Sequence, residues 1–432
     1  MKKRWIILFS ILILVSISGL FATENESLFT IADVNINQAD VAWMITAALL
    51  VLLMTPGLSF FYGGMVRSKN IISTMLQSFI AMGIISVVWV VFGFSLTFGD
   101  DIGGVIGNPA TFFMFKDVGV STHELLAPTI PLALFALFQM KFAILTPSLI
   151  TGSFAERVRF SSYIIFMLLF SIFVYAPLAH CTWHPEGLFK QMGVIDFAGG
   201  IVVHASSGTA ALAGAMFLGR RSQTGKHRPA NIPFVLLGTA LLWIGWFGFN
   251  SGSALAADGI AVKAFLNTNT ASAMGMLTWL FFDGIRGRKM SATGTAIGAV
   301  VGLVGITPSA GYVTVGESMF IGLISAIICN IAVYWKNKSS LDDALDVFPT
   351  HGIGGIVGTI LTGVFVNGLL DGHIRIFFNH ILAVLIVMIY TFVVTYGLYW
   401  LTNKIVSMRV SPASERIGLD ISQHNERYGF EE

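Results

Sequence analysis

Long apolar runs separated by short polar loops fill this sequence from about residue 41 to residue 403. Each run is long enough, or nearly so, to cross the roughly 30 Å hydrocarbon core of a bilayer. Helices are expected because lipid cannot pair exposed backbone groups, and the runs are too long for barrel strands. The sequence therefore predicts an all-α, polytopic membrane protein with eleven transmembrane helices, at 41–63, 71–98, 128–152, 160–180, 197–219, 231–256, 264–285, 291–308, 313–335, 348–368 and 376–403.

Composition supports the membrane assignment. Of 432 residues, 55% are hydrophobic and 11% are charged, against about 25% charged in ordinary soluble domains. The net charge of +2 does not indicate a nucleic-acid partner, because the basic residues lie in short loops between apolar runs. The two cysteines, Cys181 and Cys329, do not form a disulfide framework. We expect no cofactor, no resident metal ion and no enzymatic activity.

The first residues have the plan of a secretory signal peptide: a basic start, an apolar run and then small residues. Cleavage after Gly19 or Ala22 is the favoured interpretation, and an uncleaved membrane anchor is the alternative. The chain is then divided into a signal peptide (1–22), a transmembrane domain (23–406) and a polar cytoplasmic tail (407–432).

Lysine and arginine are distributed unevenly between the two sets of loops, thirteen on one side and four on the other. Since cytoplasmic loops are enriched in these residues, the larger set is expected on the cytoplasmic side of the cell membrane. The mature N-terminus then lies outside and the C-terminus lies in the cytoplasm. The inner set is Arg67, Lys69, Arg157, Arg159, Arg220, Arg221, Lys226, Arg228, Arg286, Arg288, Lys289, Lys336 and Lys338; the outer set is Lys116, Lys190, Lys263 and Arg375.

Two histidines stand in similar surroundings in two halves of the chain. His204 follows Asp196 by eight residues and His351 follows Asp346 by five, both in glycine-rich apolar runs. Spans one to five and six to ten are odd-numbered sets, so the second set has inverted topology, and the two histidines approach the middle of the membrane from opposite sides. Such 5+5 inverted repeats, here followed by a long eleventh helix, commonly hold a transport site at the midplane.

Ionisable groups at membrane depth are costly and usually line a pathway, which favours a pore-lining role for the histidine pair. Small residues one helical turn from each histidine would let the two helices approach closely: Gly200, Ser207, Gly208, Gly354 and Gly355. The alternative is that each imidazole bonds a carbonyl and only stabilises packing. Asp196 and Asp346 are expected to act, at least in part, as helix caps, and Asp196 could also hold a cation electrostatically.

Four segments in this order resemble the ammonium transporter (Amt/methylammonium permease/Rh) family: Thr55–Asn70, Asp196–Gly200, Gly245–Ser253 and Asp346–Gly352. The resemblance extends from about Asp40 to Tyr428. It implies an eleven-helix protomer, a homotrimer and one narrow path through each protomer.

The resemblance also implies roles for individual residues. Phe138, Trp183 and Ser253 match the outer ammonium-recruitment site, and Phe142 and Phe249 match two stacked rings that close the pore beneath it. His204 and His351 match the family's paired histidines, and Asp196 matches its acidic residue near the outer vestibule.

This residue set suits ammonium. An indole face attracts a cation by up to about 2 kcal/mol when desolvated, and Ser253 offers a hydroxyl acceptor. An unpaired ion in the apolar path below would cost many kcal/mol, but ammonium, unlike potassium, can release a proton and continue as ammonia. The hypothesis is that ammonia moves down the pore while the proton travels separately through His204 and His351, so that net transport is electrogenic.

Two positions depart from the family pattern. Lys141 lies between the two pore phenylalanines in sequence, where the family has a small or apolar residue, and is expected to face the subunit interface or to reach outward. The tail 415–428 resembles a regulatory segment that binds PII signalling proteins, but Asn425 replaces its usual glycine. A PII-type partner at the cytoplasmic face is therefore expected with this one exception to the motif.

Three alternatives remain open from the sequence. One is an electroneutral ammonia or carbon dioxide channel of the Rh type, which the outer cation site disfavours. Another is a membrane enzyme with a metal on His204, His351 and Asp196, which the separation of about 12 Å along the helix disfavours. A third is an ammonium sensor that acts through a partner.

Overall fold

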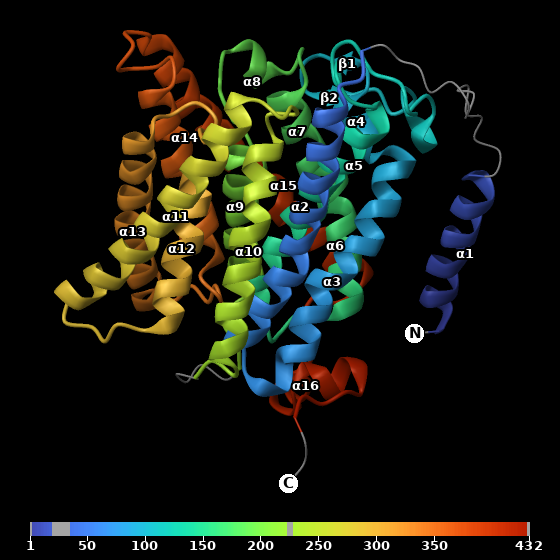
Figure 1. Cartoon of the computed structure of the whole chain (residues 1–432). Helices are drawn as coiled ribbons and strands as arrows, with labels where there is room; N and C mark the ends of the chain where they lie inside the picture. Colours follow the sequence, from blue (N-terminus) through green and yellow to red (C-terminus); the bar gives the residue numbers. More distant parts are fainter. Residues whose placement is uncertain (1, 20–34, 223–227, 430–432) are drawn as a thin grey trace.

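Helices that run from one end of the molecule to the other form its body in the computed structural model, which describes residues 2–19, 35–222 and 228–429 (Figure 1). Within these ranges nine helical segments are long and apolar enough to cross a membrane. They are Gln38–Met65 (α2); Ser68–Phe98, which contains α3 (Ile71–Val88) and α4 (Phe94–Phe98); Leu132–Phe154, with α5 (Leu132–Ile150); Phe160–Gln191, with α6 (Phe160–Phe170), α7 (Ala176–Trp183) and α8 (Leu188–Gln191); Gly200–Leu218, with α9 (Ser206–Leu218); Ile232–Gly252 (α10); Val315–Lys338 (α13); Phe348–Phe365, with α14 (Ile353–Phe365); and Ile374–Ile405 (α15).

The two remaining predicted spans are also helical but fall short of the same standard. α12 (Ala292–Ile306) has 15 residues, too few to qualify. α11 (Gly259–Ile285) has 27 residues but includes the polar run 267–270 and is not among the nine. The amide of Asn267 donates to the carbonyls of Ala310 and Val313, so this polar side chain is paired inside the protein. Eleven spans remain a prediction, with helices at all eleven places.

Several helices begin where the sequence offers a side-chain acceptor to unpaired backbone amides. Asn37 caps α2, Asn231 caps α10 and Asp258 caps α11. Thr314 and Glu317 form a reciprocal capping box at the start of α13. These polar residues lie just outside the apolar runs, and therefore they fix where the helices begin.

The first spans of the two predicted halves, α2 and α10, pack with their backbones almost in contact. A Cβ atom on Gly238 of α10 would stand 2.3 Å from the amide nitrogen of Phe61 in α2, and one on Gly64 would stand 2.6 Å from the carbonyl oxygen of Asn231. No side chain fits into these gaps, so the small residues determine how closely the helices approach. Such a pairing of first spans suits an inverted repeat, which itself stays a prediction.

The two ends of the bundle differ (Figure 1). One end carries α8 and a short hairpin of β1 (Asp101–Ile102) and β2 (Ile106–Gly107), joined through two glycines with positive φ. The other end carries α16 (Pro412–Ile417). α1 (Lys2–Gly19) lies outside the bundle. Of the two expected cleavage positions, Gly19 ends this helix and Ala22 falls outside the described residues, so removal of the signal stays a prediction.

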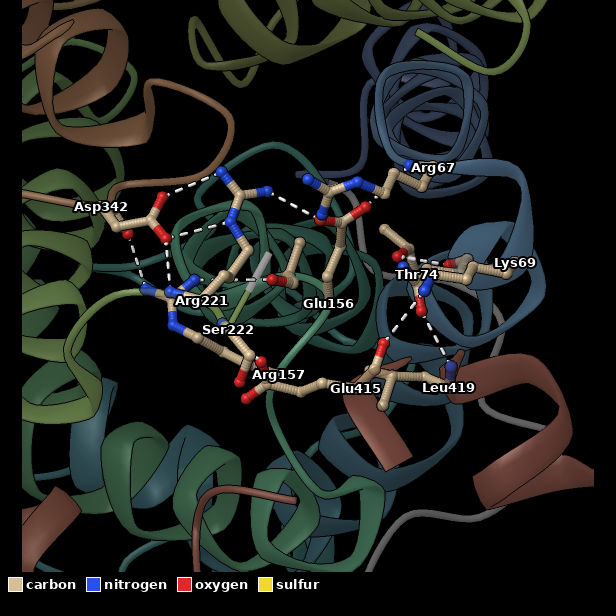
Figure 2. Close-up of polar contacts among 12 residues, drawn as sticks. Arg67, Lys69, Thr74, Glu156, Arg157, Arg221, Ser222, Asp342, Glu415 and Leu419 are labelled. Atoms are coloured by element: carbon tan, nitrogen blue, oxygen red, sulfur yellow. Dashed lines mark hydrogen bonds and ion pairs between the residues drawn. The ribbon is translucent and has the colours of Figure 1, made fainter. Parts of the chain in front are cut away.

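The tail from residue 407 to residue 429 folds against the bundle. Asp420 accepts hydrogen bonds from the amides of Ile72 and Ser73 at 3.1 and 2.8 Å, and so caps the start of α3. Nζ of Lys69 donates to the backbone carbonyls of Glu415 and Arg416 at 3.1 and 2.6 Å. Figure 2 shows Glu415 and Leu419 of the tail beside Lys69. The tail is therefore a packed part of this end of the molecule.

Asn425, the departure from the family motif, has φ 57° and ψ 37°. This left-handed conformation suits glycine, and asparagine is among the side chains that tolerate it best. Asparagine at this position therefore adopts a backbone conformation that glycine would also adopt readily.

Candidate functional site

The two histidines meet inside the bundle. Nδ1 of His204 lies 3.3 Å from Nδ1 of His351, and the ring centroids are 5.3 Å apart with an interplanar angle of 25°. Both side chains are buried, with 0% and 3% exposure. Because one nitrogen of this pair must donate and the other accept, the two imidazoles are held in different tautomers. The mirrored sequence motifs predicted this encounter.

Each histidine lies in a wide, π-helical turn that opens its span. His204 is in Gly200–Ala205, ahead of α9, and His351 is in Phe348–Gly352, ahead of α14. Wide turns of this kind are rare and frequently occur at functional sites. They were not predicted, since apolar periodicity does not distinguish an i→i+5 turn from an α-helical one.

Glycines let the two histidine-bearing segments cross. A Cβ on Gly208 would stand 2.0 Å from the amide nitrogen of Gly352, and one on Gly355 would stand 2.6 Å from the carbonyl oxygen of Gly200. Both values are far below any real Cβ contact, so neither glycine accepts a side chain without moving backbone. The close approach expected from these small residues is confirmed.

Asp196 caps the first of the two segments. Its Oδ1 accepts from the amides of Gly199 and Gly200, and its Oδ2 accepts from those of Ile201 and Val202, at 2.6–3.2 Å. Asp196 is 6% exposed, and both of its carboxylate oxygens bond the helix start. The expected capping role is confirmed, and both oxygens are directed at backbone amides.

The expectation that Asp346 caps the second segment is wrong. Asp346 has a positive φ of 59° and contacts Nζ of Lys336 at 2.6 Å, so it serves in an ion pair instead. The cap is Asp343, whose Oδ2 accepts from the amide of Phe348 at 2.8 Å. Asp343 precedes His351 by eight residues, the same spacing as between Asp196 and His204. Asp343, and not Asp346, is therefore the counterpart of Asp196.

Asp343 is an unusual cap because it is completely buried. Burial raises the pKa of its carboxyl to about 6, although Lys336 acts in the opposite direction. Its neighbour Asp342 behaves differently: burial opposes ionisation there too, but the hydrogen bond and charge of Arg221 lower its pKa to about 2. Two adjacent aspartates therefore titrate far apart.

Aromatic rings form a continuous stack that ends on the histidines. The rings of Phe142 and Phe249 lie 4.3 Å apart at 33°, and Phe249 lies 6.0 Å from the imidazole of His204. Trp246 stacks on His204 at 5.2 Å and donates through Nε1 to Thr307 at 2.9 Å. Trp246 was not predicted as a site residue, although it lies within the Gly245–Ser253 motif.

A cavity of about 520 Å³ opens above this stack and is lined by Phe142, Trp183, Asp196 and Ser253. Ser253 donates its hydroxyl hydrogen to the carbonyl of Phe249 at 2.8 Å, so its oxygen remains an acceptor. Trp183 donates through Nε1 to the carbonyl of Asp196 at 3.0 Å, which fixes the indole. The cavity also holds residues that sequence reasoning did not assign: Gln139, Lys190, Tyr312 and Asn367.

Two predicted positions lie behind the cavity wall. Phe138 is 0% exposed and does not line the cavity, but packs edge-on against Phe142 at 5.0 Å. Lys141 is 9% exposed, with its Nζ 3.9 Å from the sulfur of Met140, and it does not line the cavity either. The structure therefore brings Trp183, Ser253, Phe142, Phe249 and both histidines into one line, with Phe138 supporting it.

A family model described as the Ammonium Transporter Family matches residues 42–428. A putative ammonium transporter of Methanothermobacter thermautotrophicus is 44% identical, over 90% of this chain and 98% of that protein. An ammonium transporter of Bacillus subtilis is 43% identical with the same coverage.

Solved structures agree. Mep2 of Candida albicans superposes with a TM-score of 0.83 at 33% identity, covering 90% of each chain. A structure titled Sensor Amt Protein has a TM-score of 0.83 at 30% identity and covers 89% of this chain and 98% of that one.

Proposed function

The chain belongs to the ammonium transporter family, and we propose that it recruits ammonium in the outer cavity, deprotonates it and conducts ammonia past the histidine pair. One observation carries the proposal: Nε2 of His204 is buried and has no hydrogen-bond partner among the residues that the structure describes. An orphaned ring nitrogen is costly unless it serves a ligand. It lies beneath the aromatic stack, where a molecule that has passed the rings would meet it.

Recruitment rests on Trp183 and Ser253. A cation near an indole gains about 2 kcal/mol when desolvated, and the free lone pairs of Ser253 accept one of the four N–H groups of ammonium. Phe138 takes part by holding Phe142 in position. Lys190 also lines the cavity and is exposed, so its positive charge opposes cation binding there.

The pair Phe142–Phe249 acts as the gate. At a centroid distance of 4.3 Å the rings are in contact, so passage requires them to rotate apart. An ion entering this apolar zone would lose its water without gaining a partner, which favours release of a proton first. Potassium has no such route, and selectivity follows from that difference.

The proton travels through the imidazole pair. With one Nδ1 donating to the other across 3.3 Å, the pair offers an acceptor nitrogen on one side and a donor on the other. Transfer along the pair reverses both tautomers, and net transport then carries charge.

Orientation, assembly and partners belong to the same proposal. The Lys/Arg bias supports a place in the cell membrane, with the cavity outside and the tail inside. Family resemblance supports a homotrimer and a PII-type partner at the cytoplasmic end. The packed tail and the left-handed Asn425 are compatible with that partner.

Two related functions compete with this one. An electroneutral gas channel would need no cation site, and the aromatic and hydroxyl groups of the cavity disfavour it. An ammonium sensor is the second competitor, because a neighbour titled Sensor Amt Protein shares the fold. Both are separated from transport by one experiment: ammonium applied to proteoliposomes should produce a current, together with methylammonium uptake, and neither alternative yields that current on its own.

A further inference from the structure

Three side chains with metal-binding atoms gather near the outer cavity: Asp101, His180 and His184. One donor atom from each lies within 4.8 Å of the other two. Asp101 belongs to β1, whereas the histidines lie at the end of α7, so the folding of the hairpin onto the helix creates the cluster. No sequence motif predicted this cluster.

The two histidines are four residues apart and therefore share one helix face. Their rings stack at 4.4 Å with an interplanar angle of 12°. His180 is 0% exposed and His184 is 6% exposed, while the Asp101 side chain remains 21% exposed. A small ion can therefore reach the cluster from the Asp101 side.

The hydrogen bonding of His180 is the second observation. Its Nδ1 lies 2.9 Å from the carbonyl oxygen of Thr97 and its Nε2 lies 2.8 Å from Oδ1 of Asp101. Both neighbours are acceptors, and a neutral imidazole has one N–H to donate. When Nδ1 donates to the carbonyl, the lone pair of Nε2 faces Asp101 and is available to a metal ion. Metal-binding histidines are usually held by just such a backbone carbonyl.

The other two groups have capacity left. Oδ1 of Asp101 accepts from the amide of Gly104 at 2.7 Å, and no hydrogen bond from the described residues reaches its Oδ2. His184 accepts at Nδ1 from the amide of Glu186 at 3.2 Å. Binding through Nε2 moves its proton to Nδ1 and gives up that long bond.

We propose that Asp101, His180 and His184 form a binding site for one divalent transition-metal ion of the zinc class, open to a water molecule at its fourth position. Two imidazoles and a carboxylate suit Zn²⁺ and disfavour Ca²⁺ and Mg²⁺, which prefer oxygen ligands. Metal–ligand distances of about 2.0–2.1 Å require donor atoms about 3.4 Å apart. The cluster must contract by about 1.4 Å at most from its present spacing, through side-chain rotation and the glycine turn after β1.

The site has a consequence for transport, which rests on the proposed function. His184 is adjacent to Trp183, and both Trp183 and Pro185 line the outer cavity. A bound divalent ion would add positive charge beside the place where ammonium is recruited. Zinc at the outer face therefore lowers the ammonium current by repelling the substrate.

Calorimetric titration of Zn²⁺ into the full chain, purified with a histidine-free tag, tests the site, with Co²⁺ absorption as a second readout. Wild type should bind one Zn²⁺ per chain and give tetrahedral Co²⁺ bands. His184→Ala and Asp101→Asn should each weaken binding tenfold or more, and His373→Ala, at an exposed outer histidine, should not.

Absence of zinc binding to wild type, or equal binding by all four proteins, would overturn the site and leave the contact between His180 and Asp101 as a structural hydrogen bond. The current is measured separately with and without zinc. If zinc binds as expected but does not lower the wild-type current, the effect on transport is wrong and the metal site stands. If no ammonium current exists in any condition, the proposed function fails and the binding result is unaffected.

Discussion

Gly208 of α9 leaves no room for a side chain, because a Cβ there would stand 2.0 Å from the amide nitrogen of Gly352, the residue after His351. The distance between the two histidines thus depends on a glycine four residues after His204. The crossing of the two segments sets the 3.3 Å contact between the ring nitrogens.

Gly208→Ala should therefore separate the histidine pair and abolish methylammonium uptake, with a lowered melting temperature. Gly83→Ala is the matched control, since a Cβ on Gly83, also within a helix, meets nothing within 4 Å. Alanine there should be neutral, or stabilising by up to about 1 kcal/mol. Uptake by Gly208→Ala at the wild-type rate would show that the close crossing does not matter.

Asp343 should make stability pH-dependent. Its pKa is raised to about 6 in the fold, from about 3.9 in an unfolded chain, so the native state favours the protonated form. The contribution of Asp343 to the free energy of unfolding, up to about 3 kcal/mol, is fully present below about pH 4 and is lost as pH rises through 6. Asp343→Asn keeps an acceptor for Phe348 and should flatten the melting temperature between pH 4 and 7.

Asp342→Asn is the neighbouring control, because the pKa of Asp342 is about 2 and lies below this range. The melting temperature of this variant should differ from that of wild type by a similar amount throughout the range from pH 4 to 7. If the melting temperatures of wild type and Asp343→Asn change equally with pH, the buried carboxyl does not titrate in this range.

Recruitment should depend on the indole face of Trp183. Trp183→Leu removes the cation–π interaction and should raise the apparent KM for methylammonium roughly tenfold, the equivalent of a loss of about 1.4 kcal/mol. Trp183→Phe retains a weaker aromatic face and should lie between the two. If Phe and Leu weaken transport equally, the lost bond from Nε1 to the carbonyl of Asp196 is responsible instead.

The tail offers a backbone test at Asn425. Asn425→Gly should be neutral, whereas Asn425→Ala should cost about 1 kcal/mol because alanine resists φ 57°. Hydrogen exchange of the hydrogen-bonded amides within the tail, such as those of Leu419 and Glu426, should then accelerate about fivefold. Identical exchange in the alanine variant and wild type would rule out a strained position.

The sequence predicted the parts of this molecule that rest on long-range patterns. Apolar runs located the helices, and the mirrored motifs predicted the meeting of His204 and His351. Local geometry was less accessible. Asp346 and Asp343 are both plausible caps in sequence, and only the path of the chain into the π-helical turn decides between them.

Contacts between distant segments were beyond sequence reasoning for a similar reason. Trp246 stacks on His204 because α10 passes beside the first histidine segment. Asp101 meets His180 because a two-residue strand folds back over α7. Neither pairing leaves a periodic signal in the chain.

The charge carried per ammonium ion tests the proton relay most directly. Current and methylammonium uptake should be recorded in parallel on the same proteoliposomes, for wild type and for His204→Ala. We expect wild type to move charge with each substrate molecule, and His204→Ala to lose the current while any remaining uptake is electroneutral. A wild type that transports without current, or a His204→Ala variant with unchanged charge per substrate, would contradict the relay.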